Sequence, residues 1–468
     1  MTTFGGVQFI NLATGIFRSK IAAVWLGTQG VGFLGLILTT FNLIVGSLNL
    51  GLPTSVIKHI SGSAENSLPK KLRITKILSL LLGVFSAGIC FVFAQRLSDI
   101  TFENGDYTWA FRLLSVSVFL KQISSVYSSI LQSTTHLKKL ANANIIANIL
   151  GILFTVPLYY YFHIKGVIYN LISVGFIEIL IFYLYYKSLK IKEQNVTKNE
   201  FVTESKSIIG DGIFFNLSGF LTLLSAYLLQ MFISSYGDLR TLGFYISGFT
   251  ILNTYVAIIF TAMSVDYFPR ISKNTDNNCE NLNQEVNHQL FVGMIILFPI
   301  LLVLLLLSHI VVVVLYSKEF LETELYLQLA MLGVFFKLFS WTVGFVILAK
   351  GSRKTILSNA LIYNSVFLIT HILGFYLDGL QGVAIASSVY FLIHLLGNYW
   401  ITYKKLGIRI ENKNIKTYIA FCFIIILCVV LNFSMEDFWI KKGIISLIII
   451  AATAWSLKHL NTIFRWIK

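Results

Sequence analysis

Long apolar runs separated by short polar stretches follow one another along the whole chain. A run of about 20 apolar residues is long enough to cross a hydrocarbon core of roughly 30 Å as an α-helix. Reading the apolar runs against the polar breaks predicts fourteen transmembrane helices. They lie near residues 5–27, 31–52, 76–97, 109–131, 141–162, 166–187, 208–234, 241–265, 288–315, 325–349, 355–377, 381–403, 415–433 and 441–459. The pattern therefore predicts an all-α polytopic membrane protein.

Composition supports lipid as the main solvent of this chain. Of the 468 residues, 56% are hydrophobic and only 12% are charged, and the mean hydropathy is +0.77. Soluble globular proteins carry about 25% charged residues. The net charge of +15 is explained by loops that face anionic lipid headgroups. We therefore expect membrane lipids as partners and no nucleic acid.

The distribution of basic residues predicts the orientation of the helices. Cytoplasmic loops retain Lys and Arg, whereas translocated loops are depleted of them. With the N-terminus inside, most of the 36 Lys and Arg residues fall in loops on the cytoplasmic side. The opposite loops hold only Arg96, Lys165, Arg240, Lys318, Lys441 and Lys442. Both termini are therefore predicted to be cytoplasmic.

The chain also contains an internal duplication at an offset of 216 residues, the separation of Lys121 and Lys337. The segment FRLLSVSVFLKQISS, from Phe111, aligns without a gap with LQLAMLGVFFKLFSW, from Leu327. The same register matches Pro53 with Pro269, Val118 with Val334, Phe119 with Phe335, Ser124 with Ser340, Lys138 with Lys354, Asn148 with Asn364, Tyr160 with Tyr376, Gly166 with Gly382 and Val167 with Val383. The fourth predicted helix maps onto the tenth, so both copies cross the membrane in the same direction.

This parallel repeat predicts the organisation of the chain. Residues 1–190 and 208–403 form two lobes of six helices each, with a cytoplasmic linker over 191–207. Residues 404–468 add the last two helices and a cytoplasmic tail. Two related lobes around one axis suggest a central cavity.

Five basic residues fall inside the predicted spans, namely Arg18, Lys20, Arg112, Lys121 and Lys337. A charge at the bilayer centre costs about 2.5–3.5 kcal/mol on insertion scales, so such residues usually face a bundle interior and serve function. Lys121 and Lys337 lie near the middle of equivalent helices and are the best candidates for a cationic binding site. Arg18 projects roughly 200° away from Lys20, so only one of them faces a given cavity. Arg112 lies near a helix end, from which it can reach the headgroups.

Three acids are candidates for coupling to an ion. Glu178 lies near mid-membrane, while Asp211 and Asp266 lie near cytoplasmic helix ends. A buried lysine can pair with a buried acid and serve only helix packing, or burial can leave the lysine neutral. Because cations outnumber acids in the spans, an anionic ligand such as a diphosphate would supply the missing partner. The sequence shows no catalytic constellation, metal site or cofactor motif.

Three segments carry a family resemblance: KIAAVWLGTQGVGFLG, LGLPTSVIKHISG and LGFYISGFTILNTYVAIIFTAMSVDYFPRIS. With them, nearly the whole chain resembles the Wzx-type O-antigen and polysaccharide repeat-unit flippases. These belong to the superfamily that includes the MATE drug exporters and the peptidoglycan-precursor flippases. Lys20 lies where related flippases carry a basic residue. Gln230 departs from the pattern, because related members often carry a basic residue there.

The resemblance implies a two-lobed transporter of the bacterial inner membrane rather than an enzyme. Its substrate would be an undecaprenyl-diphosphate-linked oligosaccharide, moved from the cytoplasmic to the periplasmic leaflet by alternating access coupled to H⁺ or Na⁺. The polysaccharide polymerase and chain-length machinery are further partners that the resemblance allows. The alternative is a MATE-like ion-coupled exporter of small molecules, for which acids rather than surplus cations should line the cavity.

Overall fold

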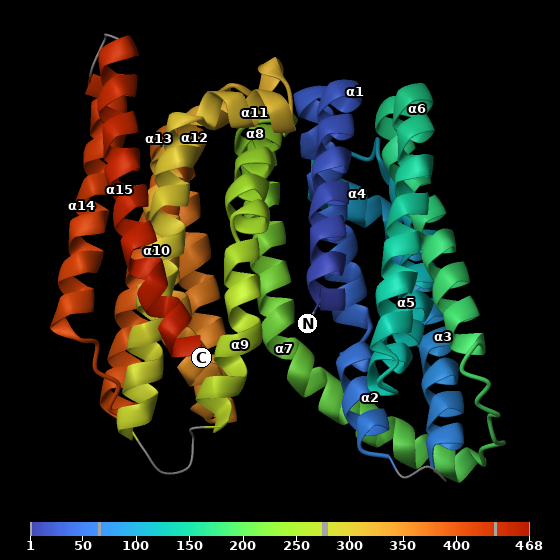
Figure 1. The fold of residues 1–468 in the computed structure, drawn as a ribbon. Helices are drawn as coiled ribbons and strands as arrows, with labels where there is room; N and C mark the ends of the chain where they lie inside the picture. Colours follow the sequence, from blue (N-terminus) through green and yellow to red (C-terminus); the bar gives the residue numbers. More distant parts are fainter. Residues whose placement is uncertain (1, 64–66, 274–278, 435–437, 468) are drawn as a thin grey trace. The chain divides into compact units, whose positions relative to one another are not determined.

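The computed structural model describes residues 2–63, 67–273, 279–434 and 438–467, and within these ranges nearly every residue is helical (Figure 1). The helices are α1 (Thr2–Leu48), α2 (Leu52–Ser61), α3 (Leu68–Val92), α4 (Ala94–Phe102), α5 (Thr108–Ser133), α6 (Leu137–Lys187), α7 (Lys198–Tyr236), α8 (Leu239–Thr250), α9 (Ile258–Lys273), α10 (Cys279–Leu306), α11 (Ser308–Leu315), α12 (Glu322–Lys350), α13 (Arg353–Leu406), α14 (Asn412–Ser434) and α15 (Phe438–Ile467). A π-helical turn, Ile251–Tyr255, separates α8 from α9, and a 3₁₀ turn, Lys318–Phe320, precedes α12.

Three helices are too long for a single crossing of a membrane. Helices α1, α6 and α13 contain 47, 51 and 54 residues. Each is interrupted near its middle by non-helical backbone, at Gly27 in α1, His163 in α6 and Asp378–Gly379 in α13. Among the described residues, eleven helices are long and apolar enough to span a membrane. The three interruptions raise this number to fourteen segments, which confirms the predicted helical membrane architecture.

The chain divides into two compact units, Met1–Gly243 and Phe244–Lys468. In the first unit α5 packs against α3 and α6, while α1 packs against α6 and α7. In the second unit α12 packs against α13, α10 and α14. These units are defined by their internal contacts, whereas the predicted lobes, 1–190 and 208–403, are defined by the sequence repeat. The lobes therefore remain a prediction.

The start of α7 lies inside the predicted linker. Thr197 caps the helix, since its hydroxyl accepts from the Glu200 amide while the Glu200 carboxylate accepts from the Thr197 amide. The Lys70 ammonium, 2.6 Å from the Glu200 carboxylate, holds the pKa of that carboxyl at about 2. Lys76 forms a second ion pair with Glu193. The linker is thereby fastened to α3 within the first unit.

The duplication is visible in the local structure of each unit. Helices α6 and α13 begin at Leu137 and Arg353, positions that the 216-residue register makes equivalent. Their interruptions also match, because His163 and Gly379 stand in the same register. The backbone angles agree closely, with φ 46° and ψ −125° at His163 and φ 51° and ψ −133° at Gly379. The two copies therefore fold into the same interrupted hairpin.

A close backbone contact follows each interruption. A Cβ added at Gly166 would lie 2.2 Å from the Leu158 carbonyl oxygen, and one added at Gly382 would lie 1.8 Å from that of Gly374. These distances leave no room for a side chain, so glycine lets the two halves of each hairpin approach. Close packing of the two helix halves thus explains why both copies carry glycine at this position, Gly166 and Gly382.

The matched interruptions allow a test of backbone strain. Only glycine adopts a positive φ of this kind without strain, which for other residues is on the order of 1–3 kcal/mol. We expect Gly379→Ala to lower the free energy of unfolding by about 1–3 kcal/mol, because an added Cβ there meets no atom within 4 Å and only the backbone is affected. The matched change His163→Gly should leave stability unchanged or raise it. Unfolding in detergent measures both, and an equal loss in both variants would contradict this account.

Candidate functional site

The first unit holds a half-buried ion pair between α5 and the second half of α6. The Lys121 ammonium nitrogen lies 2.8 Å from a carboxylate oxygen of Glu178. The Ser124 hydroxyl donates to the same oxygen at 3.2 Å. The side chains of Lys121 and Glu178 are 40% and 21% exposed, so the pair is reachable from outside the helix packing. The charge of Lys121 is matched by an acid of its own unit.

Arg18 joins α1 to α6 in the same unit. Its guanidinium donates through Nη2 to the backbone carbonyl of Asn148 at 3.2 Å. A Cβ added at Gly151 would lie 2.7 Å from that nitrogen, so the glycine makes room for the arginine. The guanidinium is thereby held by the backbone of α6.

In the second unit, Lys337 has neutral neighbours. Its ammonium donates to the side-chain oxygen of Asn253 at 2.9 Å. The nitrogen also lies 5.6 Å from the ring centroid of Phe260 and 5.5 Å from that of Phe391, which are cation–π distances. In the part of the chain that the structure describes, no acid pairs with Lys337. The half-buried ammonium is held by a dipole and two aromatic faces.

Asn253 reaches Lys337 from the π-helical turn between α8 and α9. Single π turns inside helices widen the helix locally and frequently occur at functional sites. Sequence analysis missed Asn253, because an asparagine in an apolar run gives no sign of a π turn. The residue becomes significant only once the backbone places its amide beside a lysine.

A polar network adjoins Lys337 on α12 and α13. The Ser340 hydroxyl forms a short hydrogen bond with Nδ1 of His394. The Asn398 side chain donates to the Ser340 hydroxyl at 3.3 Å, and Asn359 donates to Asn398 at 3.1 Å. Sequence analysis also missed His394, although the 216-residue register applied to Glu178 leads directly to it. Histidine and glutamate do not look alike in a sequence comparison, so the match passed unnoticed.

The remaining predicted residues lie apart from these clusters. Lys20 is half-buried in α1, and Arg112 is exposed near the start of α5, as expected for a residue that reaches headgroups. Asp211 binds Lys58 at 2.7 Å and His59 at 3.0 Å, and the hydrogen bond from Lys58 lowers the pKa of its carboxyl.

Asp266 lies near the end of α9. It pairs with Arg270 at 3.0 Å while its own side chain is 67% exposed. Arg270 also contacts Glu285 and Gln289 on α10, so the arginine links the two helices. Asp266 is therefore more exposed than either side chain of the Lys121–Glu178 pair.

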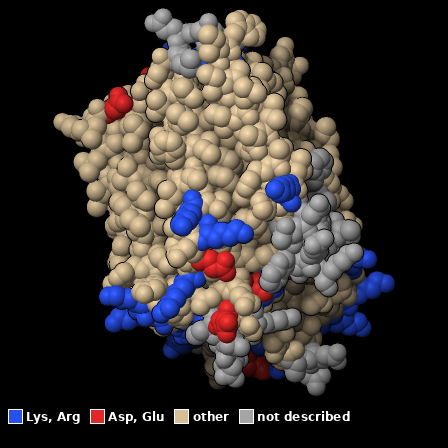
Figure 2. Space-filling view, turned by 60° about the vertical axis from the view of Figure 1, so that its left-hand side comes forward, with Lys and Arg blue, Asp and Glu red and all other residues tan. Residues whose placement is uncertain are grey.

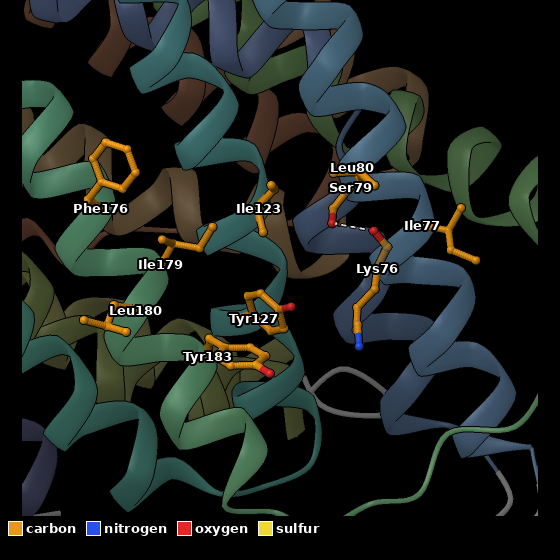
Figure 3. A pocket seen from close by; sticks show the side chains of 10 residues that line it. All are labelled: Lys76, Ile77, Ser79, Leu80, Ile123, Tyr127, Phe176, Ile179, Leu180 and Tyr183. Carbon is orange, nitrogen blue, oxygen red and sulfur yellow. Dashed lines mark hydrogen bonds between the residues drawn. The ribbon is translucent and has the colours of Figure 1, made fainter.

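A groove of about 690 Å³ opens on the side of the first unit between α3, α5 and α6 (Figure 3). Its walls are mostly apolar, and exposed side chains such as Leu80 and Leu180 line it. The charged group at its end, Lys76, is already bound to Glu193. The groove therefore suits contact with lipid chains rather than recognition of a charged headgroup.

Long apolar helices that hold half-buried charged clusters are typical of a polytopic membrane protein. The sequence pattern of the family described as polysaccharide biosynthesis proteins matches residues 23–325. The chain belongs to this family. It is also 22% identical over 348 residues to a Shigella flexneri protein named "Putative O-antigen transporter", a match that covers 70% of this chain and 79% of that protein.

Solved structures show the same fold. The lipid II flippase MurJ in an inward closed conformation has a TM-score of 0.72 and 18% identity to this chain. The match covers 99% of this chain and 100% of MurJ. An inward-facing multidrug resistance MATE transporter has a TM-score of 0.72 and 14% identity, covering 86% and 94% of the two chains. A transporter from Pyrococcus furiosus has a TM-score of 0.63 and 15% identity, covering 86% and 96%. The fold is that of the superfamily to which these transporters belong.

The ion pair in the first unit makes a thermodynamic prediction. We expect Lys121→Met and Glu178→Gln to be coupled by about 0.6–1.7 kcal/mol in a double-mutant cycle, the range for polar contacts between membrane helices. Unfolding of the four proteins in detergent measures the coupling energy. Arg112→Met removes an exposed cation from the same helix and serves as the control, with coupling to Glu178→Gln near zero. Equal coupling in the two cycles would show that the Lys121–Glu178 contact has no specific energy.

Proposed function

We propose that this protein is a flippase that moves an undecaprenyl-diphosphate-linked oligosaccharide from the cytoplasmic to the periplasmic leaflet of a bacterial inner membrane by alternating access. The observation that carries the proposal is the surroundings of Lys337. A half-buried ammonium held by Asn253, Phe260 and Phe391 keeps a charge that an anion can match. Membership of the polysaccharide biosynthesis family supports a glycan as the cargo.

The physical problem of such a transport step is the diphosphate. A polyprenyl tail can stay in lipid during the movement, but an ionised group that leaves water without a partner meets a severe desolvation penalty. Charge-assisted hydrogen bonds from an ammonium reduce that penalty. Lys337 would supply them in the second unit, and Lys121, Lys20, Arg18 and Arg112 are the further cations proposed to accompany the substrate.

Glu178 is the leading candidate for coupling to H⁺ or Na⁺. Its carboxylate binds both the Lys121 ammonium and the Ser124 hydroxyl. A proton or a sodium ion at this carboxylate would weaken its hold on Lys121 and free the ammonium for an anion. Asp211 and Asp266 are the weaker candidates, because both are engaged with basic side chains. Asp211 lies before the span Asn216–Tyr236, and Asp266 lies near the end of the span Leu239–Ser272.

The proposed orientation places both termini in the cytoplasm. In the second unit α12 starts with Glu322 and Glu324 and ends with Lys350, and α13 ends with Lys404 and Lys405. Figure 2 shows Lys and Arg gathered toward the lower end of one face, below an area with few charges. Such an asymmetry supports a cytoplasmic location for the basic end. The polysaccharide polymerase and chain-length machinery remain proposed partners.

A MATE-like exporter of small molecules is the second candidate, since the fold matches such a transporter as well as it matches MurJ. A carrier of cationic drugs needs an acid that is available to its cargo. The acid at mid-membrane, Glu178, is occupied by Lys121 in this structure. The charge of the available groups therefore favours an anionic substrate.

The proposal predicts the effect of removing the charge of Lys337. In a strain that depends on this protein, we expect Lys337→Ala to lower surface polysaccharide about tenfold or more, equivalent to roughly 1.4 kcal/mol of lost interaction, at an unchanged protein level. Lys337→Arg, which keeps the charge, should retain more transport. Gel analysis of the polysaccharide and immunoblotting of the membranes measure the two quantities.

Lys354→Ala is the control for this experiment, because Lys354 is an exposed residue at the start of α13. Lys121→Ala is measured in parallel. Normal polysaccharide in both Lys121→Ala and Lys337→Ala would exclude the cationic site. A fall in protein level that matches the fall in polysaccharide would instead show that the lysines serve folding.

A further inference from the structure

The two midplane lysines belong to equivalent clusters that share a serine but differ in the side chain which that serine contacts. The 216-residue register pairs Lys121 with Lys337 and Ser124 with Ser340. It also pairs Glu178 with His394. In the first unit the serine hydroxyl binds the carboxylate of Glu178, and in the second unit it binds the imidazole of His394. The side chain at this position therefore meets the same serine in both copies.

The position of the lysine side chain follows from that difference. In the first unit Lys121 donates to Glu178, 2.8 Å away. In the second unit His394 offers no carboxylate, and Lys337 donates instead to Asn253. One lysine is thus neutralised by its partner at the matched position, whereas the other is not.

The other neighbours of Lys337 are also particular to the second unit. In the same register Asn253, Phe260 and Phe391 correspond to Ile37, Ile44 and Gly175 of the first unit, and Asn398 corresponds to Phe182. The first unit therefore lacks the amide and the rings at these positions. The second unit has dipoles and aromatic faces around a lysine that lacks an acidic partner among the described residues.

The consequence for binding is electrostatic. A lysine paired with a carboxylate presents almost no net charge to a ligand, and an anion must displace the acid to reach it. An amide oxygen and two aromatic faces stabilise an ammonium without cancelling its charge. An anion can then add its own hydrogen bonds to the remaining ammonium hydrogens.

We propose that the residue at the matched position decides which lysine is available to an anionic substrate: His394 keeps Lys337 available, whereas Glu178 occupies Lys121. His394 is a positioning and specificity residue in this account, held by Ser340 and Asn398. The inference rests on the proposed function in one respect, namely that the substrate carries an anionic group.

The test places the acid of the first unit into the second. His394→Glu gives Lys337 the partner that Lys121 has, and His394→Gln is its uncharged counterpart of the same shape. Purified protein is titrated with farnesyl diphosphate as the probe, and the dissociation constants are compared. We expect His394→Glu to bind about tenfold or more weakly than His394→Gln, a difference of roughly 1.4 kcal/mol. Equal affinity of the two variants would overturn the proposal.

A second variant tests the same idea from the first unit. Glu178→Gln removes the acid from Lys121, so binding of farnesyl diphosphate should become tighter or gain a second equivalent. Unchanged affinity and stoichiometry in this variant would count against the proposal even if His394→Glu failed to fold. Lys354→Glu adds a negative charge to an exposed turn of α13 and should bind as the unaltered protein does.

The binding measurements distinguish a failure of the proposed function from a failure of the proposed role of His394 and Glu178. If the unaltered protein binds no farnesyl diphosphate, or if inorganic pyrophosphate fails to displace the bound probe, the anionic substrate of the proposed function is excluded. If the unaltered protein binds the probe and both exchanges leave binding unchanged, the proposed function stands and the role of His394 and Glu178 is excluded.

Discussion

A charge that enters the hydrocarbon region must be matched there, because lipid offers neither water nor counterions. The described charged groups of the spans meet this requirement in three ways. Lys121 is matched by the carboxylate of Glu178, Arg18 by the end of a backbone dipole at Asn148, and Lys337 by an amide and two rings. The carboxylate cancels the charge of Lys121, whereas the neutral carbonyl, amide and rings leave the charges of Arg18 and Lys337 in place. A cation whose charge is not cancelled is what an anionic substrate, as proposed, would require inside the membrane.

Backbone geometry determines where these groups can meet. The interruptions at His163 and Gly379 fold α6 and α13 back on themselves. The second half of each helix carries the residue, Glu178 or His394, that contacts the serine of the same unit. The close approach at Gly166 and Gly382 fixes how the two halves pack. Glu178 and His394 thus occupy equivalent places because the same hairpin was built twice, even though their chemistry differs.

Most of the fold could be predicted from hydrophobic periodicity and the internal repeat. Fourteen apolar segments and the equivalence of Lys121 and Lys337 follow from spacing alone. The sequence allows Lys121 to pair with a buried acid such as Glu178 but does not predict that pair over the alternatives. The reason is that the rotation of each helix about its axis depends on tertiary packing. Asn253 could not be found at all, since local sequence does not announce a π turn. His394 could be found only by applying the repeat register to Glu178, a position at which the two copies carry different residues.

The fusion of two copies in one chain has a consequence for how such a site can evolve. In a pair of identical subunits every substitution occurs twice, so both lysines would carry the same partner and would be neutralised or available together. A single chain with two copies can alter one of them alone. Glu178 and His394 differ in this way: the acid neutralises the lysine of its own copy, whereas Lys337 has no acidic partner among the described residues.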